Sequence, residues 1–220
     1  MDAMQKFLEY TSAYDDGSDT RIKLKIIHTQ RVTEVMEQLT AALPLSEQDK
    51  KLAYLCAVYH DIGRFEQLKR YHTFLDYKSI DHAQLGCEIL RQGDFLDELS
   101  AREREQVLKA IGNHNRLAIE DGLDEKTLLF AKLIRDADKC DIFRVFAQDT
   151  TGFSAEQVGQ EAVSDVVYES ILGHYCIKKQ ERKTGLDVWV SFLGFFFDLN
   201  FAESLRIALK QGYCKKCFSE

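Results

Sequence analysis

The sequence predicts an all-α protein, and three features of the chain lead to that prediction. Apolar residues return every three or four positions along most of the 220 residues, which is the spacing of one buried helix face. The chain has a single proline, Pro44, so few positions interrupt a helix from within. Long stretches with the alternation of a strand are missing. The chain therefore reads as a succession of amphipathic helices.

The periodic segments predict eight helices joined by short polar turns. Ser46 and Ser79 stand where the third and fourth of them should begin, and serine is a favoured N-cap residue. Residues 64–78 have no clear period, and we expect a loop there, of a length that is often functional. The predicted helices are 3–13, 21–42, 46–61, 79–92, 98–115, 125–147, 156–179 and 185–211.

Length and composition favour one domain that spans residues 1–220. Hydrophobic residues make up 45% of the chain and charged residues 30%, which is the balance of a globular protein with a substantial core. No apolar run approaches the ~20 residues of a transmembrane helix, and the N-terminal residues lack the order of a signal peptide. We therefore expect a cytosolic protein that has no contact with a membrane.

Charge and cysteine content exclude further classes. The formal net charge of -7 argues against binding to a nucleic-acid polymer, which is itself anionic. Any phosphate-bearing substrate must then be held by a few local cations or by a metal ion. The six cysteines are scattered, and reduced thiols in apolar helical patterns behave as small hydrophobic residues, so disulfides are not expected.

Histidine and aspartate residues fall on the buried faces of the second and third predicted helices. His28 lies in the apolar stripe of the second helix, four residues after Leu24 and four before Val32. The apolar stripe of the third helix leads into His60, and Asp61 follows where that helix should stop. Both helices are thus predicted to direct polar side chains at the core.

The next three predicted helices repeat this pattern. His82 aligns with Gly86 in the fourth helix, and a glycine there allows another helix to approach closely. The apolar stripe of the fifth helix ends at His114, and Asp138 shares the apolar face of the sixth helix with Ile134. Five helices therefore each direct one or two metal-ligand residue types toward the core.

These polar residues together predict a metal site. A single inward histidine is most often a hydrogen-bonded core residue. Four imidazoles and two carboxylates are costly to bury together, however, and a bound cation satisfies them all. Imidazole and carboxylate without thiolate suit iron, manganese, cobalt or zinc, whereas an all-oxygen set would suit magnesium or calcium. We expect one or two divalent transition-metal ions.

The order of these residues resembles the HD-domain superfamily of metal-dependent phosphohydrolases, in its binuclear subgroup. The resemblance covers a motif core at 21–145 and leaves a C-terminal helical region at 146–220. Within it, the final aspartate is assigned to Asp138 rather than to Asp136 or Asp141, because Asp138 alone matches the motif position and lies on the apolar face. The matching segments are IIHTQRV, YHDIGRF, DHAQLGCEIL, IGNHNR and RDADKCDIFR.

The resemblance implies an all-α fold with the site between helices, and it implies a role for each ligand residue. Asp141, one turn after Asp138, is a candidate to contact a metal-ligand residue rather than the metal ion itself. The implied first ion is held by His28, His60, Asp61 and Asp138, and the second by His82 and His114 with Asp61 as the bridge.

Departures from better-known branches bear on the substrate. The HD-GYP branch carries paired histidines and a Gly-Tyr-Pro stretch, whereas NHNRLAIEDGLDEK has one histidine and no such stretch. Alarmone hydrolases carry an acidic pair where this chain has Arg64 and Phe65, and a deoxynucleoside-monophosphate nucleotidase branch also needs acids nearby. None of these branches fits well, so the expected substrate is a small phosphorylated metabolite or nucleotide.

Basic residues after the HD doublet are candidates for substrate contact. Arg64 follows the doublet by three residues, where the HD-GYP branch places a phosphate-binding lysine, and we expect it to act with Asp61 in catalysis; the alternative is a surface arginine. Lys69, Arg70, Tyr71 and His72 form a basic, aromatic cluster that can cover a nucleotide or sugar phosphate, or else is a solvated loop.

Two C-terminal features have weaker interpretations. Cys214 and Cys217 have the spacing of half a zinc site, but no second pair accompanies them. The aromatic segment 189–201 favours burial in the core or in the interface of a homodimer. His174 has no motif around it and is expected to serve the structure.

The sequence supports three functional hypotheses. The first is a metal-dependent phosphohydrolase that cleaves a phosphoester through a metal-activated water. The second is a mixed-valent di-iron oxygenase, an activity that relatives with the same six ligands have, and oxygen-dependent turnover would distinguish it. The third is a non-catalytic module that binds a metabolite, which has no need of six costly buried ligands.

Overall fold

The computed structural model describes residues 2–15, 17, 19–147 and 160–213, and their secondary structure is helical throughout. The predicted all-α class is confirmed. Contacts group the chain into two compact units, Met1–Asp138 and Lys139–Glu220. The expectation of one domain stays a prediction, as do the cytosolic location and the homodimer. Within the described residues, no helix has the length and apolar character needed to cross a membrane.

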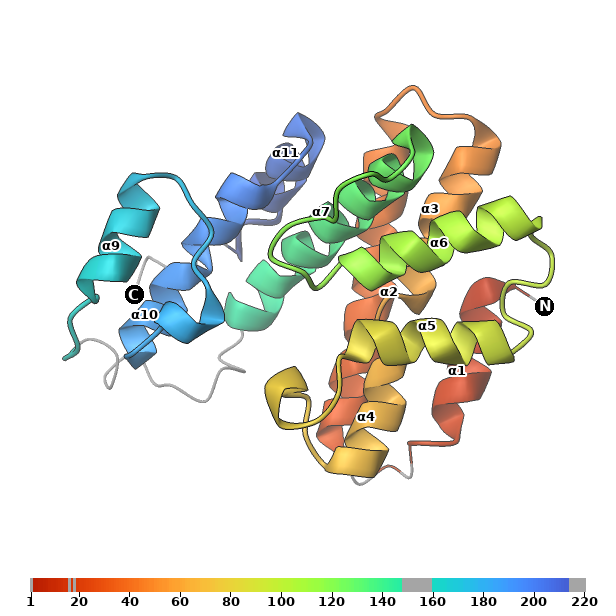
Figure 1. The fold of residues 1–220 in the computed structure, drawn as a ribbon, viewed down its shortest axis with the longest axis horizontal. Helices are drawn as coiled ribbons and strands as arrows, with labels where there is room; N and C mark the ends of the chain where they lie inside the picture. The colour runs from red at the N-terminus through yellow and green to blue at the C-terminus, as the bar shows by residue number, and fades with distance from the viewer. Residues whose placement is uncertain (1, 16, 18, 148–159, 214–220) are drawn as a thin grey trace. The chain divides into compact units, whose positions relative to one another are not determined.

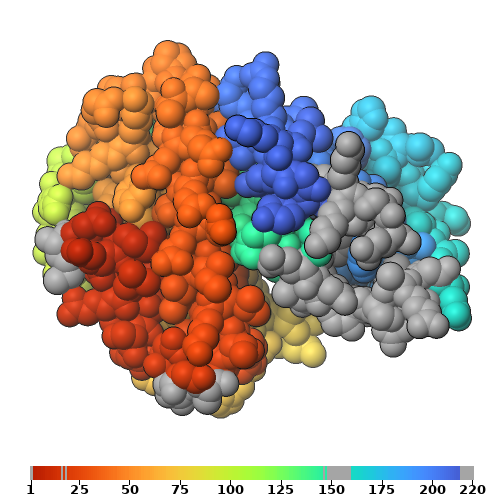
Figure 2. All heavy atoms as spheres, turned by 180° about the vertical axis from the view of Figure 1, so that it is seen from behind, coloured from red at the N-terminus to blue at the C-terminus, as the bar shows by residue number. Residues whose placement is uncertain are grey.

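The first unit is a packed set of helices. Helices α2 and α3 pack on each other, α3 packs on α6, and α5 lies between α4 and α6 (Figure 1). Side chains of α1 and α2 cover the face of this unit that Figure 2 shows. The helices that begin in this unit are α1 (Ala3–Ser12), α2 (Thr20–Ala41), α3 (Glu47–Tyr59), α4 (Gly63–Tyr71), α5 (His82–Gln92), α6 (Ala101–Asn113) and α7 (Glu125–Ala147), with a 3-10 turn at Asp76–Lys78.

The loop predicted for residues 64–78 is wrong for most of its length, because α4 occupies Gly63–Tyr71. Phe65 and Leu68 are buried one turn apart, and Phe7 meets Phe65 edge to face at 5.6 Å between ring centroids. The helix is only about two turns long, and its charged residues interrupt the short apolar face, so the sequence shows no clear helical period there. The third predicted helix correspondingly ends at Tyr59 rather than at residue 61.

Helix starts depend on which side chain reaches the free backbone N–H groups. Ser46 accepts a hydrogen bond from the Asp49 N–H and begins α3 as predicted. The prediction for Ser79 is wrong, because Asp81 accepts from the Ala83 and Gln84 N–H groups and begins α5 instead. A carboxylate at this position also suits the positive end of the helix dipole.

The apolar stripe predicted around His28 is correct except at its N-terminal end. Leu24 is 43% exposed, whereas Ile22 and His28 are buried. Two residues correspond to about 200° around a helix, so the burial of Ile22 turns Leu24 toward solvent.

The second unit is more broken than the sequence predicts. Of the predicted helix 156–179, the described part is helical only over Asp165–Leu172 (α9), and it ends at Gly173 ahead of His174, whose φ is +60°. The predicted helix 185–211 is three segments: α10 (Gly185–Ser191), a 3-10 helix (Leu193–Asp198) and α11 (Ala202–Gln211). A further 3-10 turn spans Lys179–Glu181.

Tertiary contacts explain the break within the aromatic segment. Phe196 stacks on Phe143 at 4.6 Å between ring centroids, and Asp198 accepts an ion pair from Lys139 at 2.8 Å. These contacts hold the segment in 3-10 form, overriding its α-helical period. Cys214 and Cys217 lie outside the described residues.

Candidate metal centre

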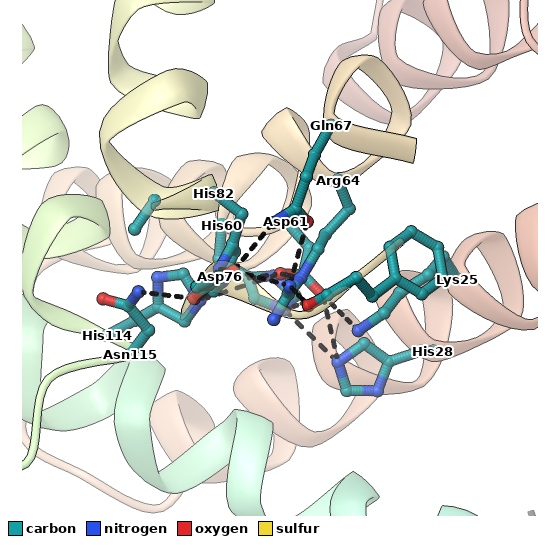
Figure 3. A network of polar contacts seen from close by, with 12 residues as sticks. Lys25, His28, His60, Asp61, Arg64, Gln67, Asp76, His82, His114 and Asn115 are labelled. Carbon is teal, nitrogen blue, oxygen red and sulfur yellow. Dashed lines mark hydrogen bonds and ion pairs between the residues drawn. The ribbon is translucent and has the colours of Figure 1, made fainter. Parts of the chain in front are cut away.

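The six predicted ligand residues come from five helices that begin in the first unit, and four of them lie at helix ends or in the turn after a helix. His28 lies within α2, and Asp138 lies within α7 at the end of the first unit. Figure 3 shows their side chains converging, apart from Asp138, with others beside them. His60 is the C-cap of α3, Asp61 follows it, His82 begins α5, and His114 is the C-cap of α6.

One group of ligand atoms joins His28, His60 and Asp138. The Nε2 atoms of His28 and His60 are 3.4 Å apart, and Asp138 Oδ1 lies 3.1 Å from His28 Nε2. These three residues each present an atom within 4.8 Å of the others, a spacing that can hold a metal ion. We call them the Asp138 group.

A second group joins Asp61, His82 and His114. The Nε2 atoms of His82 and His114 are 3.1 Å apart, and Asp61 Oδ1 lies 3.2 Å from His82 Nε2 and 3.7 Å from His114 Nε2. These atoms also lie within 4.8 Å of one another. We call these residues the Asp61 group.

The two oxygens of Asp61 face different groups. Oδ1 faces His82 and His114, whereas Oδ2 lies 3.7 Å from His28 Nε2 and 3.6 Å from His60 Nε2. A carboxylate oriented in this way can contact two centres at once, which an imidazole cannot do through one nitrogen. Asp61 therefore connects the two groups.

Three of the histidines have ring orientations fixed through their Nδ1 atoms. His60 Nδ1 lies 2.8 Å from the Ala57 carbonyl oxygen, and His114 Nδ1 lies 2.7 Å from that of Ile111. A carbonyl oxygen only accepts, so both Nδ1 atoms donate and a neutral ring keeps its Nε2 lone pair for a cation. Asp76 holds His82 Nδ1 in the same way at 2.8 Å.

Burial and charge set the protonation of the centre. Burial lowers the pKa of His60 to about 4, against the raising effect of Asp61 and Asp138, so its imidazole is neutral at neutral pH. Burial acts to raise the pKa of Asp61, but the Lys25 ammonium and the nearby histidines outweigh it and hold this pKa well below its usual range. The pKa of Asp138 is lowered in the same sense, with His28 opposing the effect of burial.

Two residues that the sequence did not single out contact the centre. Lys25 donates to Asp61 Oδ2 at 2.6 Å, and Asp76 holds His82. Lys25 lies three residues before His28, and this helical spacing placed it one turn away on the same side. Asp76 lies in a segment without a period, and nothing in the residue pattern pointed to it.

Arg64 lies beside the centre, where several groups hold it. Its Nη1 donates to the Phe74 carbonyl at 2.6 Å, to Asp76 Oδ1 at 2.9 Å and to the side chain of Gln67 at 3.0 Å. Its Nε lies 3.4 Å from Asp61 Oδ1. Arg64 is therefore a partly buried connector between Asp61 and Asp76 rather than an exposed surface residue.

The other predicted substrate residues contact a different set of side chains. Lys69 lies over the ring of Tyr14 at 5.3 Å, and Arg70 forms an ion pair with Glu66 at 2.6 Å. None of these partners belongs to a ligand group, and Tyr71 is 42% exposed. A substrate contact by Lys69, Arg70 or Tyr71 stays a prediction.

The remaining acidic candidates have other surroundings. Asp141 forms a double contact with Arg144 at 2.6 and 2.8 Å, and Asp136 is fully buried. A third set of atoms within metal-binding distance joins Asp76, Asp81 and His82, but Asp81 also serves as the N-cap of α5. The donor chemistry therefore fits a cation best at the two groups that Asp61 connects.

Comparison with known proteins agrees with this geometry. A family model described as HD domain matches residues 26–142, a range that contains all six ligand residues. No curated protein and no solved structure matches the chain.

Proposed function

Because the chain belongs to the HD-domain family, we propose that it is a metal-dependent phosphohydrolase that cleaves a phosphoester of a small phosphorylated metabolite or nucleotide. The observation that carries this proposal is the orientation of Asp61, whose two oxygens face two separate sets of imidazoles. A centre of that kind is suited to two divalent ions, of which iron and manganese, or cobalt and zinc, accept these ligands.

In the proposed site, divalent ions supply Lewis acidity to a phosphoryl oxygen and lower the pKa of a bound water. His28, His60 and Asp138 would hold one ion, and His82 with His114 would hold the other. Asp61 would serve both. The carbonyls of Ala57 and Ile111 accept from the Nδ1 atoms of two imidazoles and keep their Nε2 atoms aimed at the centre, so these rings need not reorganise when an ion binds.

Arg64 and the basic cluster are the proposed substrate contacts. Arg64 has its guanidinium between Asp61 and Asp76, close enough to the centre to help stabilise charge on a bound phosphate. We assign Lys69, Arg70 and Tyr71 to a more distant part of the substrate, since their partners Tyr14 and Glu66 lie outside the ligand groups.

The test compares Asp61→Asn with His82→Ala and with the unaltered protein. Asparagine keeps the shape of aspartate but removes the charge, so we expect weaker binding of both ions and a rate of hydrolysis lower by several orders of magnitude. His82→Ala should weaken only one ion. The measurements are manganese titrations and initial rates on a panel of phosphorylated compounds, prepared without oxygen.

Two outcomes contradict the proposal. An Asp61→Asn protein with two tightly bound ions and near-normal turnover shows that this carboxylate does not join two ions. Turnover that requires oxygen, with no phosphate released from any compound, assigns the centre to an oxygenase instead.

A further inference from the structure

Lys25 approaches the centre from the solvent side. It lies on α2, one turn before His28, and its ammonium is 2.6 Å from Asp61 Oδ2. The side chain of Lys25 is 24% exposed, whereas that of Asp61 is 4% exposed. The Lys25 side chain is thus partly exposed to solvent while its ammonium contacts the buried carboxylate.

Phe74 is a shared neighbour of Lys25 and Arg64. The Lys25 ammonium lies 5.9 Å from the centre of the Phe74 ring, and the Arg64 guanidinium lies 5.8 Å from it. The Phe74 carbonyl also accepts from Arg64 at 2.6 Å, which fixes this residue in place. Attraction to the ring holds both cations near Asp61 without using their hydrogen-bond donors.

The two cations differ in how firmly they are held. Arg64 donates to Asp76, Gln67 and the Phe74 carbonyl, so its charge is already balanced and its position fixed. Lys25 has its close ion pair with Asp61, and a lysine ammonium is a compact charge on a flexible four-carbon stem. Lys25 can therefore move between anionic partners, whereas Arg64 cannot.

Charge balance determines what Lys25 meets when divalent ions are bound. Asp61 then shares its charge with those ions, and the attraction that holds the Lys25 ammonium weakens. The centre as a whole would then gain positive charge. An anionic substrate is the partner that restores the balance.

We propose that Lys25 binds the phosphate group of the substrate and makes the centre selective for phosphomonoesters over phosphodiesters. This inference rests on the proposed function. A monoester phosphate carries close to two negative charges at neutral pH, whereas a diester carries one. The additional cation therefore favours the monoester, and its ammonium turns from Asp61 Oδ2 to a phosphate oxygen.

The experiment uses Lys25→Met, Lys25→Arg and Lys23→Met in the full chain. Methionine keeps the length of the stem without its charge, and arginine keeps the charge. Lys23 is the matched control, since it is exposed on the same helix and its ammonium reaches the Gly17 carbonyl at 3.5 Å. Each variant is loaded with manganese, and inorganic phosphate is titrated in by calorimetry.

We expect Lys25→Met to bind phosphate about tenfold more weakly or worse, with its affinity for manganese equal or higher. Lys25→Arg should recover part of the phosphate affinity, and Lys23→Met should match the unaltered protein. With p-nitrophenyl phosphate and its bis-ester as probes, Lys25→Met should raise KM for the monoester more than for the diester.

Three outcomes overturn the inference. The first is an unchanged phosphate affinity in Lys25→Met. The second is a loss of manganese affinity in that variant, which would make Lys25 a positioning residue for Asp61. The third is that the unaltered, metal-loaded protein binds no phosphate. If phosphate binding depends on Lys25 but no ester is hydrolysed, the inference stands and the proposed function fails. If esters are hydrolysed with equal KM changes for both probes, the function stands and the selectivity fails.

Discussion

Asp76 shows how one carboxylate can organise a centre that it does not enter. It accepts from His82 Nδ1 at 2.8 Å, from Arg64 at 2.9 Å and from Gln67 at 2.8 Å. Burial acts to raise the pKa of Asp76, yet His82 and Arg64 outweigh it and lower this pKa, so the group stays ionised. An ionised partner orients the His82 ring and makes its Nε2 a stronger ligand.

We predict that Asp76→Asn weakens one ion and leaves the other. Asparagine can still accept from His82 Nδ1, but it lacks the charge, and loss of such a partner typically costs about 10- to 100-fold in metal affinity. The Asp138 group does not contact Asp76 and should be unaffected. A manganese titration resolves the two affinities, with Asp97→Asn, an exposed partner of Arg104, as the control. If both manganese affinities are unchanged in Asp76→Asn, Asp76 does not support metal binding at the centre.

At the scale of single residues, the sequence identified the residues that gather at the candidate centre better than the residues that support them. His60 and Asp138 lie in helices whose apolar period is clear, so their direction could be worked out from spacing. Lys25 shares that spacing, but a lysine before a ligand is normally a solvated residue. Asp76 lies in a segment where no period exists, and only the folded chain brings it to His82.

At the scale of elements, α4 and α5 are held together by two glycines. A Cβ atom on Gly63 would lie 2.6 Å from the Gly86 nitrogen and closer still to the His82 carbonyl oxygen. The close approach predicted from Gly86 is confirmed, and its partner is the first residue of α4. Gly63 lies two residues after Asp61, and α5 begins at His82. The contact between Gly63 and Gly86 therefore holds Asp61 close to His82.

We predict that Gly63→Ala destabilises the protein by about 3 kcal/mol or more, because backbone atoms of α5 cannot yield to a new methyl group. Gly86→Ala is the matched variant, since its Cβ would lie 3.3 Å from the Gly63 nitrogen, and it should cost roughly 1 kcal/mol. Urea unfolding of both variants measures the difference. If both variants had the same free energy of unfolding as the unaltered protein, α4 and α5 could move apart without loss of stability.

The elements that the sequence missed are those that tertiary contacts decide. The buried residues of helix α4 are Gly63, Phe65, Gln67 and Leu68, too few apolar positions to establish a period among charged neighbours. The aromatic segment of the second unit has an α-helical pattern, yet Phe196 and Asp198 are held by Phe143 and Lys139. Phe143 and Lys139 lie in α7, far from this segment along the chain, so a local sequence pattern does not include them.

At the scale of the whole molecule, α7 belongs to both compact units. It spans Glu125–Ala147, and the division falls after Asp138, within the helix. All six predicted ligand residues belong to the first unit, of which Asp138 is the last residue. The part of α7 that follows Asp138 supplies Cys140 and Phe143 to the second unit.

We predict that a fragment of residues 1–147 folds and binds manganese as the full chain does, whereas a fragment of residues 1–138 loses affinity at the Asp138 group. In the shorter fragment Asp138 is the last residue of a helix, and the last turn of a helix frays. Circular dichroism and metal titration compare the fragments with the full chain. An unfolded 1–147 fragment would instead support the single domain expected from the length of the sequence.

The order of the ligands along the chain also sets an order in time. Chains emerge from the ribosome with the N-terminal residue first, at roughly 5 to 20 residues per second. The Asp61 group has all its members once His114 has been made, whereas the Asp138 group needs 24 residues more, from 114 to 138. During synthesis the Asp61 group is thus the first to emerge with a full set of donors, and Asp138 follows it into solvent 24 residues later.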